Sequence, residues 1–507
     1  MNRTPWLVLF SAVAWSGCSA GSAEQQAIDR AAAALGGRER IAAVKTLVVS
    51  GEGTAYSVGS DQLIDTNQRT FKLTGYKQAI DVAGARALVE QTRTPNTPNF
   101  AGQAPARQAQ GIDGEVAYNV GANGNRTPVA SEVTVAARRA NIYHHPLTIV
   151  RAALDPAAMV TNARTEGNET LVDVATAGGV RLRLGIDTMT GLPTRVVSTT
   201  AGENILGDVD IETSFADYQD VDGLKLPMRL ERKTDRFRDF EINVASAVDG
   251  ETGDLAAPAG ARPAPPAETA GRSPVEAEEI ARGIWHLTGT THHSVLVEFA
   301  DHLTLIEAPN EDRALGIFAK AKELRPGKPL TTLINTHHHF DHSAGVRAAV
   351  SEGLTIVTHK SNAAFYEQAA KRPRTILPDT LSKSPNPPAL KLVTVDEEMT
   401  LKDEAMTLVL YRIANNTHAD NNLMIHFPRE RLLVQADIFM PRDPRTLGHA
   451  PWVSNLRDNI EARKLSVDRH VPLHGRIVPH SEFLQVVKDG YDRTVVKEPP
   501  AYRYSPS

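Results

Sequence analysis

The segment that decides the fold of the C-terminal half is Thr336-His337-His338-His339-Phe340-Asp341-His342. Four of its side chains are strong metal ligands: His337, His339, Asp341 and His342. Imidazole and carboxylate groups suit zinc, iron and manganese alike. In an extended loop, residues two positions apart face the same way, so His337 and His339 are expected to bind one metal. Asp341 and His342 come after the chain begins to turn and can face a second metal.

The flanking residues place this segment at the end of a strand. Residues 330–335 are rich in Leu, Ile and Thr and predict a buried strand, and residues 343–350 predict a helix that begins on a Ser343 cap. Open α/β folds carry their chemistry on the loops that leave the carboxyl ends of strands. A run of histidines alone also fits a surface tract that binds metal without catalysing a reaction. Further ligands along the chain would distinguish a catalytic metal site from such a tract.

Three such ligands follow predicted strands in the remaining sequence. The strands are predicted at residues 407–414, 431–436 and 470–473, and the side chains that follow them are His418, Asp437 and His474. Each therefore lies just beyond a strand, as the first four do.

These seven residues, in this order, resemble the signature of the metallo-β-lactamase-fold superfamily, which is HxHxDH, a lone His, a bridging Asp and a final His. The resemblance covers about residues 275–485 and implies an αββα sandwich. It also implies that the first metal is held by His337, His339 and His418, that the second is held by Asp341, His342 and His474, and that Asp437 bridges the two. We expect two divalent ions, with zinc as the first choice and iron or manganese as alternatives.

Two metals about 3.5–4 Å apart can share a hydroxide at neutral pH and stabilise a developing oxyanion. The expected function is therefore a dinuclear metal-dependent hydrolase that uses a metal-bridging hydroxide on an ester, lactone, thioester or amide. Asp341 is the expected catalytic residue, because it could orient the hydroxide or relay its proton. His338 alternates away from its neighbours and is expected to pack or support a ligand.

Two functions from other classes stay open at this point. One is a lipid- or lipoprotein-binding envelope protein whose metal domain is structural. The other is a mononuclear iron dioxygenase on the same fold.

The family resemblance also suggests where substrate would be bound. His292 and His293 lie in a loop where family members place a flap over the metals, and Arg442, His449 and Trp452 lie where the family lines its pocket mouth. Glu307 ends a predicted strand where the family usually has Asp, and a supporting role beside a ligand is expected. His144 and His145 have no neighbouring ligand in the sequence and are expected to form a surface pair.

The first residues predict export. Arg3 precedes an apolar run at residues 6–15, which is too short to span a bilayer, and Ser16-Gly17-Cys18 resembles a bacterial lipobox. Residues 1–18 are thus expected to be a lipoprotein-type signal peptide, with Cys18 lipidated and the protein facing the periplasm. Ser19 in place of Asp favours the outer membrane. An ordinary signal peptide cleaved near Ala20 or Ala23 is the alternative.

Replacing the predicted lipid acceptor gives a direct test of this membrane anchor. In bacterial cells we expect the parent chain to incorporate a palmitate analogue and Cys18→Ser to incorporate none, because Cys18 is the only thiol in the chain. The label is measured on the immunoprecipitated protein. Labelling that survives the substitution would contradict the lipoprotein assignment.

Composition and net charge indicate the class of protein and its partners. The chain has 41% hydrophobic and 23% charged residues and a formal net charge of −5, so it is globular in type and nothing suggests a nucleic-acid partner. Cys18 is the only cysteine, so no internal disulfide can form, and with Cys18 lipidated no thiol is available as a metal ligand. The expected partner is a small-molecule substrate, with the membrane reached through the lipid anchor.

The N-terminal half, residues 19–250, is expected to be an antiparallel β-dominated (α+β) half-barrel. A helix at 25–35 and a short turn at 38–44 precede a series of short strands, which one helical segment near 145–154 interrupts. This half resembles periplasmic lipoprotein carriers, which implies an apolar groove able to hold an acyl chain; a spacer with a filled core is the alternative. Residues 251–274 hold five prolines and seven alanines and predict a linker to the catalytic domain at 275–507.

Overall fold

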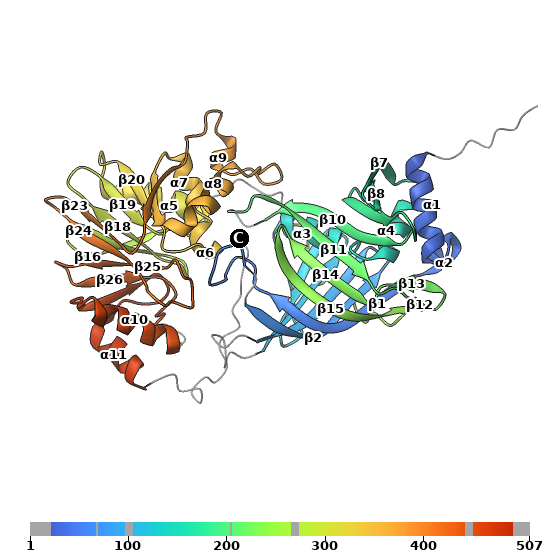
Figure 1. Ribbon diagram of the computed structural model, residues 1–507, viewed down its shortest axis with the longest axis horizontal. Helices are drawn as coiled ribbons and strands as arrows, with labels where there is room; N and C mark the ends of the chain where they lie inside the picture. Colours follow the sequence, from blue (N-terminus) through green and yellow to red (C-terminus); the bar gives the residue numbers. More distant parts are fainter. Residues whose placement is uncertain are drawn as a thin grey trace, which may run out of the picture.

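The computed structural model describes residues 22–66, 69–96, 105–202, 205–264, 273–441 and 450–489. Figure 1 shows an N-terminal half built on one large curved sheet and a C-terminal half built on two smaller sheets, as the sequence predicts. Cys18, Arg442 and His449 lie outside the described residues. Across those described ranges, no helix is both long and apolar enough to span a membrane.

The N-terminal half begins with α1 (Ala23–Leu35), which Ser22 caps, and α2 (Arg38–Ala43). Within the described residues, thirteen antiparallel strands then form one sheet in the order β6-β5-β4-β3-β2-β1-β15-β14-β11-β10-β9-β8-β7, and β12 (Gln219–Val221) pairs separately with β13 (Leu224–Leu226). The strands of the large sheet are β1 (Thr46–Tyr56), β2 (Thr70–Asp81), β3 (Arg86–Pro95), β4 (Ala106–Asp113), β5 (Val116–Val120), β6 (Arg126–Pro128), β7 (Met159–Glu166), β8 (Glu169–Ala175), β9 (Arg181–Asp187), β10 (Pro193–Ala201), β11 (Asp208–Ala216), β14 (Arg229–Thr234) and β15 (Phe237–Val248).

One face of this sheet is covered by three helices. α1 packs with α4 (Pro146–Ala153) and β7, while α3 (Glu132–Asn141) contacts β4, β5 and β10. Apolar side chains from these helices and from the sheet share one buried core, so protein side chains occupy the apolar face in this structure. The acyl-chain ligand stays a prediction. α3 is not among the helices expected from the sequence, because its ten residues carry only a short apolar pattern.

The expectation of a surface pair at His144 and His145 is wrong. The two residues are only 5% and 1% exposed. The ring of His144 lies 2.9 Å from both Thr213 Oγ1 and Ser198 Oγ, and His145 Nδ1 accepts a hydrogen bond from the backbone of Leu147 at the start of α4. Burial lowers the pKa of both imidazoles to about 3, so they are neutral members of the core. The polar partners of His144 come from β10 and β11, which its local sequence could not reveal.

The C-terminal half confirms the αββα sandwich. Its first sheet has the order β16-β17-β18-β19-β20-β21-β22 and its second has β23-β24-β25-β26-β27-β28, with an apolar core between them. The strands are β16 (Glu276–Ala281), β17 (Ile284–Thr288), β18 (Ser294–Glu298), β19 (Leu303–Ile306), β20 (Leu330–Ile334), β21 (Thr355–His359), β22 (Lys391–Val395), β23 (Glu398–Lys402), β24 (Thr407–Arg412), β25 (Leu423–Phe427), β26 (Leu432–Gln435), β27 (Arg469–Pro472) and β28 (Val478–Pro479).

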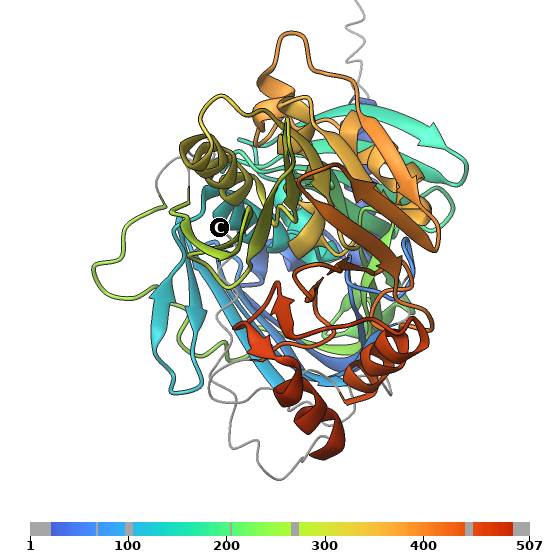
Figure 2. The ribbon, with the colours of Figure 1, turned by 90° about the vertical axis from the view of Figure 1, so that its left-hand side faces the viewer.

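Helices cover the outer faces of both sheets. α5, α7 and α8 pack on the first sheet, and α10 and α11 pack on the second, as Figure 2 shows from the side of this half. The helices are α5 (Glu311–Leu324), α6 (Phe340–Ser343), α7 (Val346–Ser351), α8 (Ala363–Lys371), α9 (Thr380–Lys383), α10 (Ala450–Ala462) and α11 (His480–Asp489).

One local prediction in this half needs correction, because the helix expected at 343–350 is divided. Ser343 ends α6 instead of capping a helix, and α7 begins after Gly345.

The two halves share a core and ion pairs. Leu206, Val209 and Phe237 of the N-terminal half belong to the same buried cluster as the side chains beneath α5, α7 and α8. Phe237 packs edge-on against Phe340 with ring centres 6.3 Å apart. Arg372 makes two 3.0 Å hydrogen bonds to the carboxylate of Asp235 across the same boundary. The large sheet is therefore fixed directly beside the loop that carries the histidines.

Candidate metal centre

The predicted ligands converge at the ends of the strands that precede them. β20 leads into His337, His339, Asp341 and His342, with α6 forming the turn that the sequence suggested. The loops after β24, β26 and β27 supply His418, Asp437 and His474. The structure gathers their ligand atoms into two groups, within each of which all atoms lie within 4.8 Å of one another. One group is His337, His339, His418 and Asp437, and the other is His292, Asp341, His342 and His474.

In the first group, hydrogen bonds leave one ring nitrogen of His339 and one of His337 free to bind metal. His339 Nε2 lies 2.8 Å from the carbonyl oxygen of Asp61, and since a carbonyl only accepts, the proton is on Nε2 and the lone pair is on Nδ1. Thr336 donates its hydroxyl hydrogen to Glu307 and so accepts from His337 Nδ1, 3.0 Å away, which leaves the lone pair on His337 Nε2. His418 Nε2 lies 3.3 Å from this atom.

The second group has the same arrangement. His474 Nδ1 donates to the carbonyl oxygen of Thr291 at 3.1 Å, and His342 Nδ1 donates to the carboxylate of Glu307 at 3.2 Å. The two remaining nitrogens, both Nε2, face each other at 3.1 Å. Ligand histidines in metalloproteins usually hold their second nitrogen in this way.

Asp437 lies between the two groups. Its Oδ2 atom is 3.5 Å from His337 Nε2, 3.2 Å from His418 Nε2 and 3.0 Å from His342 Nε2. Its Oδ1 atom is 2.9 Å from His474 Nε2, yet this buried oxygen has no hydrogen bond of good geometry to any described residue. Two atoms that each bind a tetrahedral zinc at about 2.0–2.1 Å are about 3.3 Å apart, so these spacings suit shared cations.

Burial keeps the histidines of the first group in the form that binds metal. It lowers the pKa of His337 to about 4, that of His418 to about 3, and that of His339 well below its ordinary value. Neutral imidazole is the ligand form, so no proton has to leave these rings. Burial also lowers the pKa of His342, but the carboxylates of Asp437 and Asp341 outweigh it and raise that pKa well above its ordinary value. The residues present therefore fit a pair of divalent cations.

Two carboxylate residues at the site hold backbone conformations that their side chains disfavour. Glu307 has φ of 72° and Asp437 has φ of 66°. Such strain concentrates at functional sites, where the surrounding structure enforces it. Glu307 is fully buried and accepts hydrogen bonds from Asn335, Thr336 and His342, which matches the supporting role expected for it.

The site meets solvent beside the second group. The Asp341 side chain is 44% exposed and that of His292 is 26% exposed, whereas the other grouped side chains are almost fully buried. His292 Nε2 lies 3.3 Å from Asp341 Oδ2, and its ring packs edge-on against His474. A substrate would reach the centre from this side.

The other residues predicted to contact substrate or support a ligand lie outside both groups. His293 packs against His286, with ring centres 4.9 Å apart, and is in neither group. Trp452 is 4% exposed, lies 4.6 Å from the His418 ring and donates a hydrogen bond to Thr417 at 3.0 Å, so it supports a ligand loop. His338 hydrogen-bonds to Asn421 and is also in neither group.

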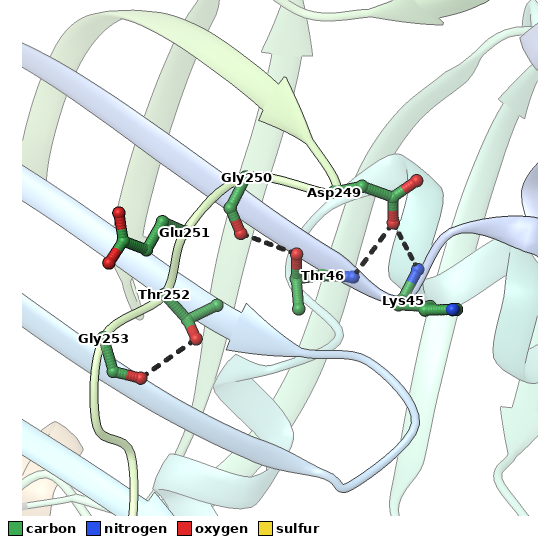
Figure 3. A pocket seen from close by; sticks show the side chains of 7 residues that line it. All are labelled: Lys45, Thr46, Asp249, Gly250, Glu251, Thr252 and Gly253. Atoms are coloured by element: carbon green, nitrogen blue, oxygen red, sulfur yellow. Dashed lines mark hydrogen bonds between the residues drawn. The ribbon is translucent and has the colours of Figure 1, made fainter.

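A hollow elsewhere in the molecule carries no comparable chemistry. It lies where β1 begins and β15 ends and is lined by Lys45, Thr46 and residues 249–253 (Figure 3). The Asp249 carboxylate accepts from the backbone N–H groups of Lys45 at 2.6 Å and Thr46 at 3.4 Å, and so ties the end of β15 to the start of β1. Among the described ranges, none of the potential metal-binding groups reaches this hollow.

The C-terminal half is similar to known proteins. Residues 287–474 match the family model for the metallo-beta-lactamase superfamily. Similar solved structures include a metallo-beta-lactamase from Pontibacter korlensis, with 17% identity, 42% of this chain and 97% of that chain covered and a TM-score of 0.33. Another is a metallo-beta-lactamase from Hirschia baltica, with 18% identity, 42% and 97% coverage and a TM-score of 0.32. No curated protein matches the sequence. Together, the family match and the converging ligands place residues 287–474 in the metallo-beta-lactamase superfamily.

Proposed function

We propose that this protein is a hydrolase that holds two divalent metal ions and cleaves an ester, lactone, thioester or amide in a small molecule. The observation that carries the proposal is the position of Asp437, whose two carboxylate oxygens lie 2.9–3.5 Å from histidine nitrogens of both groups. A single carboxylate shared in this way suits a dinuclear centre, because it can place negative charge beside both cations. Zinc is the ion proposed first, because its usual ligands are histidine nitrogens and carboxylate oxygens, with manganese and iron as alternatives.

When bound, such ions supply a water nucleophile at neutral pH and polarise the carbonyl under attack. The residues of the chain do the rest. His337, His339 and His418 present neutral nitrogens, and Asp437 adds negative charge between them and the Nε2 atoms of His342 and His474. Asp341 faces solvent, and its carboxylate contacts His292, so these two side chains can pass a proton between the site and bulk water.

The test is hydrolysis by the purified chain before and after metal removal. We expect activity on at least one member of a panel of aryl esters, lactones, thioesters and β-lactams. Activity should fall to background after dialysis against a chelator and return on addition of Zn²⁺ or Mn²⁺. Hydrolysis that is insensitive to chelation would contradict the proposal.

The same preparations separate the two competing functions. Oxygen consumption with one bound iron would favour an iron dioxygenase. Stoichiometric binding of a fatty acid or lipopeptide by a metal-loaded protein without hydrolysis would favour a lipid-binding protein with a structural metal domain.

A further inference from the structure

A segment of the N-terminal half lies beside the metal centre. Residues 57–66 leave the end of β1 and, with Arg69 at the start of β2, lie against α6 and the loop that carries His418; Figure 1 shows this blue segment beside α6. We propose that this segment, here called the β1 loop, is a positioning element that sets the metal affinity of the first group. The inference rests on the proposed function, because it concerns the same metals.

The first contact of the β1 loop fixes a ligand directly. The carbonyl oxygen of Asp61 accepts the 2.8 Å hydrogen bond from His339 Nε2, and the two residues are both only 2% exposed. This bond selects the His339 tautomer whose Nδ1 lone pair faces the first group. Outer partners of this kind orient ligand histidines and typically change metal affinity by about 10–100-fold when they are lost.

Arg69 ties the same loop to a second ligand of the same group. Its guanidinium donates to the carbonyl oxygens of Ser60 and His418, and more weakly to that of Thr417 at 3.4 Å. Its backbone N–H donates to Asp61 Oδ1 at 2.8 Å. Arg69 is 5% exposed and packs over the Trp452 ring, which itself contacts His418. One side chain therefore holds the Asp61 region and the His418 loop together.

Backbone bonds set the register of the β1 loop on the C-terminal half. The Gly59 carbonyl accepts from the Phe340 N–H at 3.2 Å, and the Gln62 carbonyl accepts from the Asp420 N–H at 2.8 Å. Gly59 has φ of 71°, and a Cβ atom there would lie 2.1 Å from the Phe340 ring. Only glycine allows this close approach, so the loop is built to fit α6.

The second group is supported differently. Its histidines are held by Glu307 and Thr291, both from the C-terminal half. Loosening the β1 loop should therefore weaken the first group selectively, whereas a general loss of packing between the halves would affect both groups. This asymmetry distinguishes a positioning element from an ordinary interdomain contact.

The experiment measures Zn²⁺ binding to the full chain by competition with a chromophoric chelator. Arg69→Met and Asp61→Ala are compared with Asp61→Asn, which keeps the oxygen that accepts from Arg69. The matched control is Asp65→Asn on the same loop, which removes only an ion pair with Arg236 of the N-terminal half. Each variant is first checked for parent-like circular dichroism and thermal unfolding.

We expect Arg69→Met and Asp61→Ala to lower the affinity for one of the two Zn²⁺ ions by about 10–100-fold and to leave the affinity for the other unchanged. Asp61→Asn and Asp65→Asn should bind both ions like the parent. In a His474→Ala background, where the first group remains intact, Arg69→Met should still lower the affinity for the remaining Zn²⁺ ion. In a His418→Ala background it should have no effect.

Three results would overturn the inference. Parent-like binding of both ions by folded Arg69→Met and Asp61→Ala would remove the positioning role. An equal loss of affinity for both ions would assign the effect to general packing between the halves. A loss of affinity seen only in the His418→Ala background would assign it to the second group. A parent chain that takes up neither Zn²⁺ nor manganese nor iron would instead overturn the proposed function together with this inference, so the two failures are distinguishable.

Discussion

Asp437→Asn is expected to lower the affinity for both metal ions and to reduce hydrolysis on the order of 10³-fold. The carboxylate oxygens of Asp437 lie 2.9–3.5 Å from histidine nitrogens of both groups, so its charge acts on both ions at once. Losing several kcal/mol of electrostatic stabilisation at such a site corresponds to a rate loss of this order. Metal content and the hydrolysis rate are measured on the same preparations.

Asparagine is the informative replacement because Asp437 has φ of 66°. Asparagine tolerates the left-handed region, whereas alanine there adds about 1–2 kcal/mol of backbone strain unrelated to the metals. Asp301→Asn is the matched control, because its side chain is 88% exposed and outside both groups. If Asp437→Asn kept two tightly bound ions and full activity, the bridging role would be refuted.

The second large effect is on stability. Arg347 on α7 is 2% exposed and donates two hydrogen bonds to the carboxylate of Asp379 at the start of α9. Its Nε lies 2.5 Å from Oδ2 and its Nη2 lies 3.1 Å from Oδ1. It also donates to the carbonyl of Ala369 at the end of α8. Arg347→Met leaves that buried carboxylate without its main partner, and removal of one member of a buried pair costs about 3–5 kcal/mol.

The pH dependence of this effect has a definite sign. Burial raises the pKa of Asp379, but hydrogen bonds from Arg347 and Ser382 outweigh it, and the net pKa is lowered. The pair therefore stabilises the parent above the ordinary aspartate pKa of about 3.9, and this contribution is lost as the pH falls through the lowered value. In Arg347→Met the unpaired carboxyl can protonate instead, so the loss of stability should shrink from pH 7 towards pH 4.

Denaturant unfolding of the metal-free chain at several pH values checks this prediction. The control is Arg457→Met, which removes an exposed pair with Asp458 and should change the free energy of unfolding by less than about 0.5 kcal/mol. Equal stabilities of Arg347→Met and Arg457→Met at pH 7 would show that the buried pair contributes nothing.

The sequence predicts the metal loop well because the information is local. His337, His339, Asp341 and His342 lie within six residues after an apolar strand, and His418, Asp437 and His474 each follow a strand of the same half. β20 belongs to the first sheet, and β24, β26 and β27 run in one direction in the second. The ligands meet where the ends of these strands from the two packed sheets come together, beyond their carboxyl ends as open α/β folds place their sites.

The supporting residues could not be predicted in the same way. Asp61 and Arg69 lie more than 250 residues before His339, in a different half, and contact the site only after the halves pack together. The Asp61 contact uses a backbone carbonyl, which no side-chain pattern reveals. His144 shows the same limit, since its burial depends on Thr213 and Ser198 from strands distant in the sequence.

Elemental mass spectrometry of the purified full chain, beside Asp437→Asn, shows whether the chain holds two divalent ions through Asp437. We expect two ions of zinc, manganese or iron per parent chain and a lower metal content in the variant. A parent chain that binds none of these metals after loading with each in turn would refute the dinuclear centre.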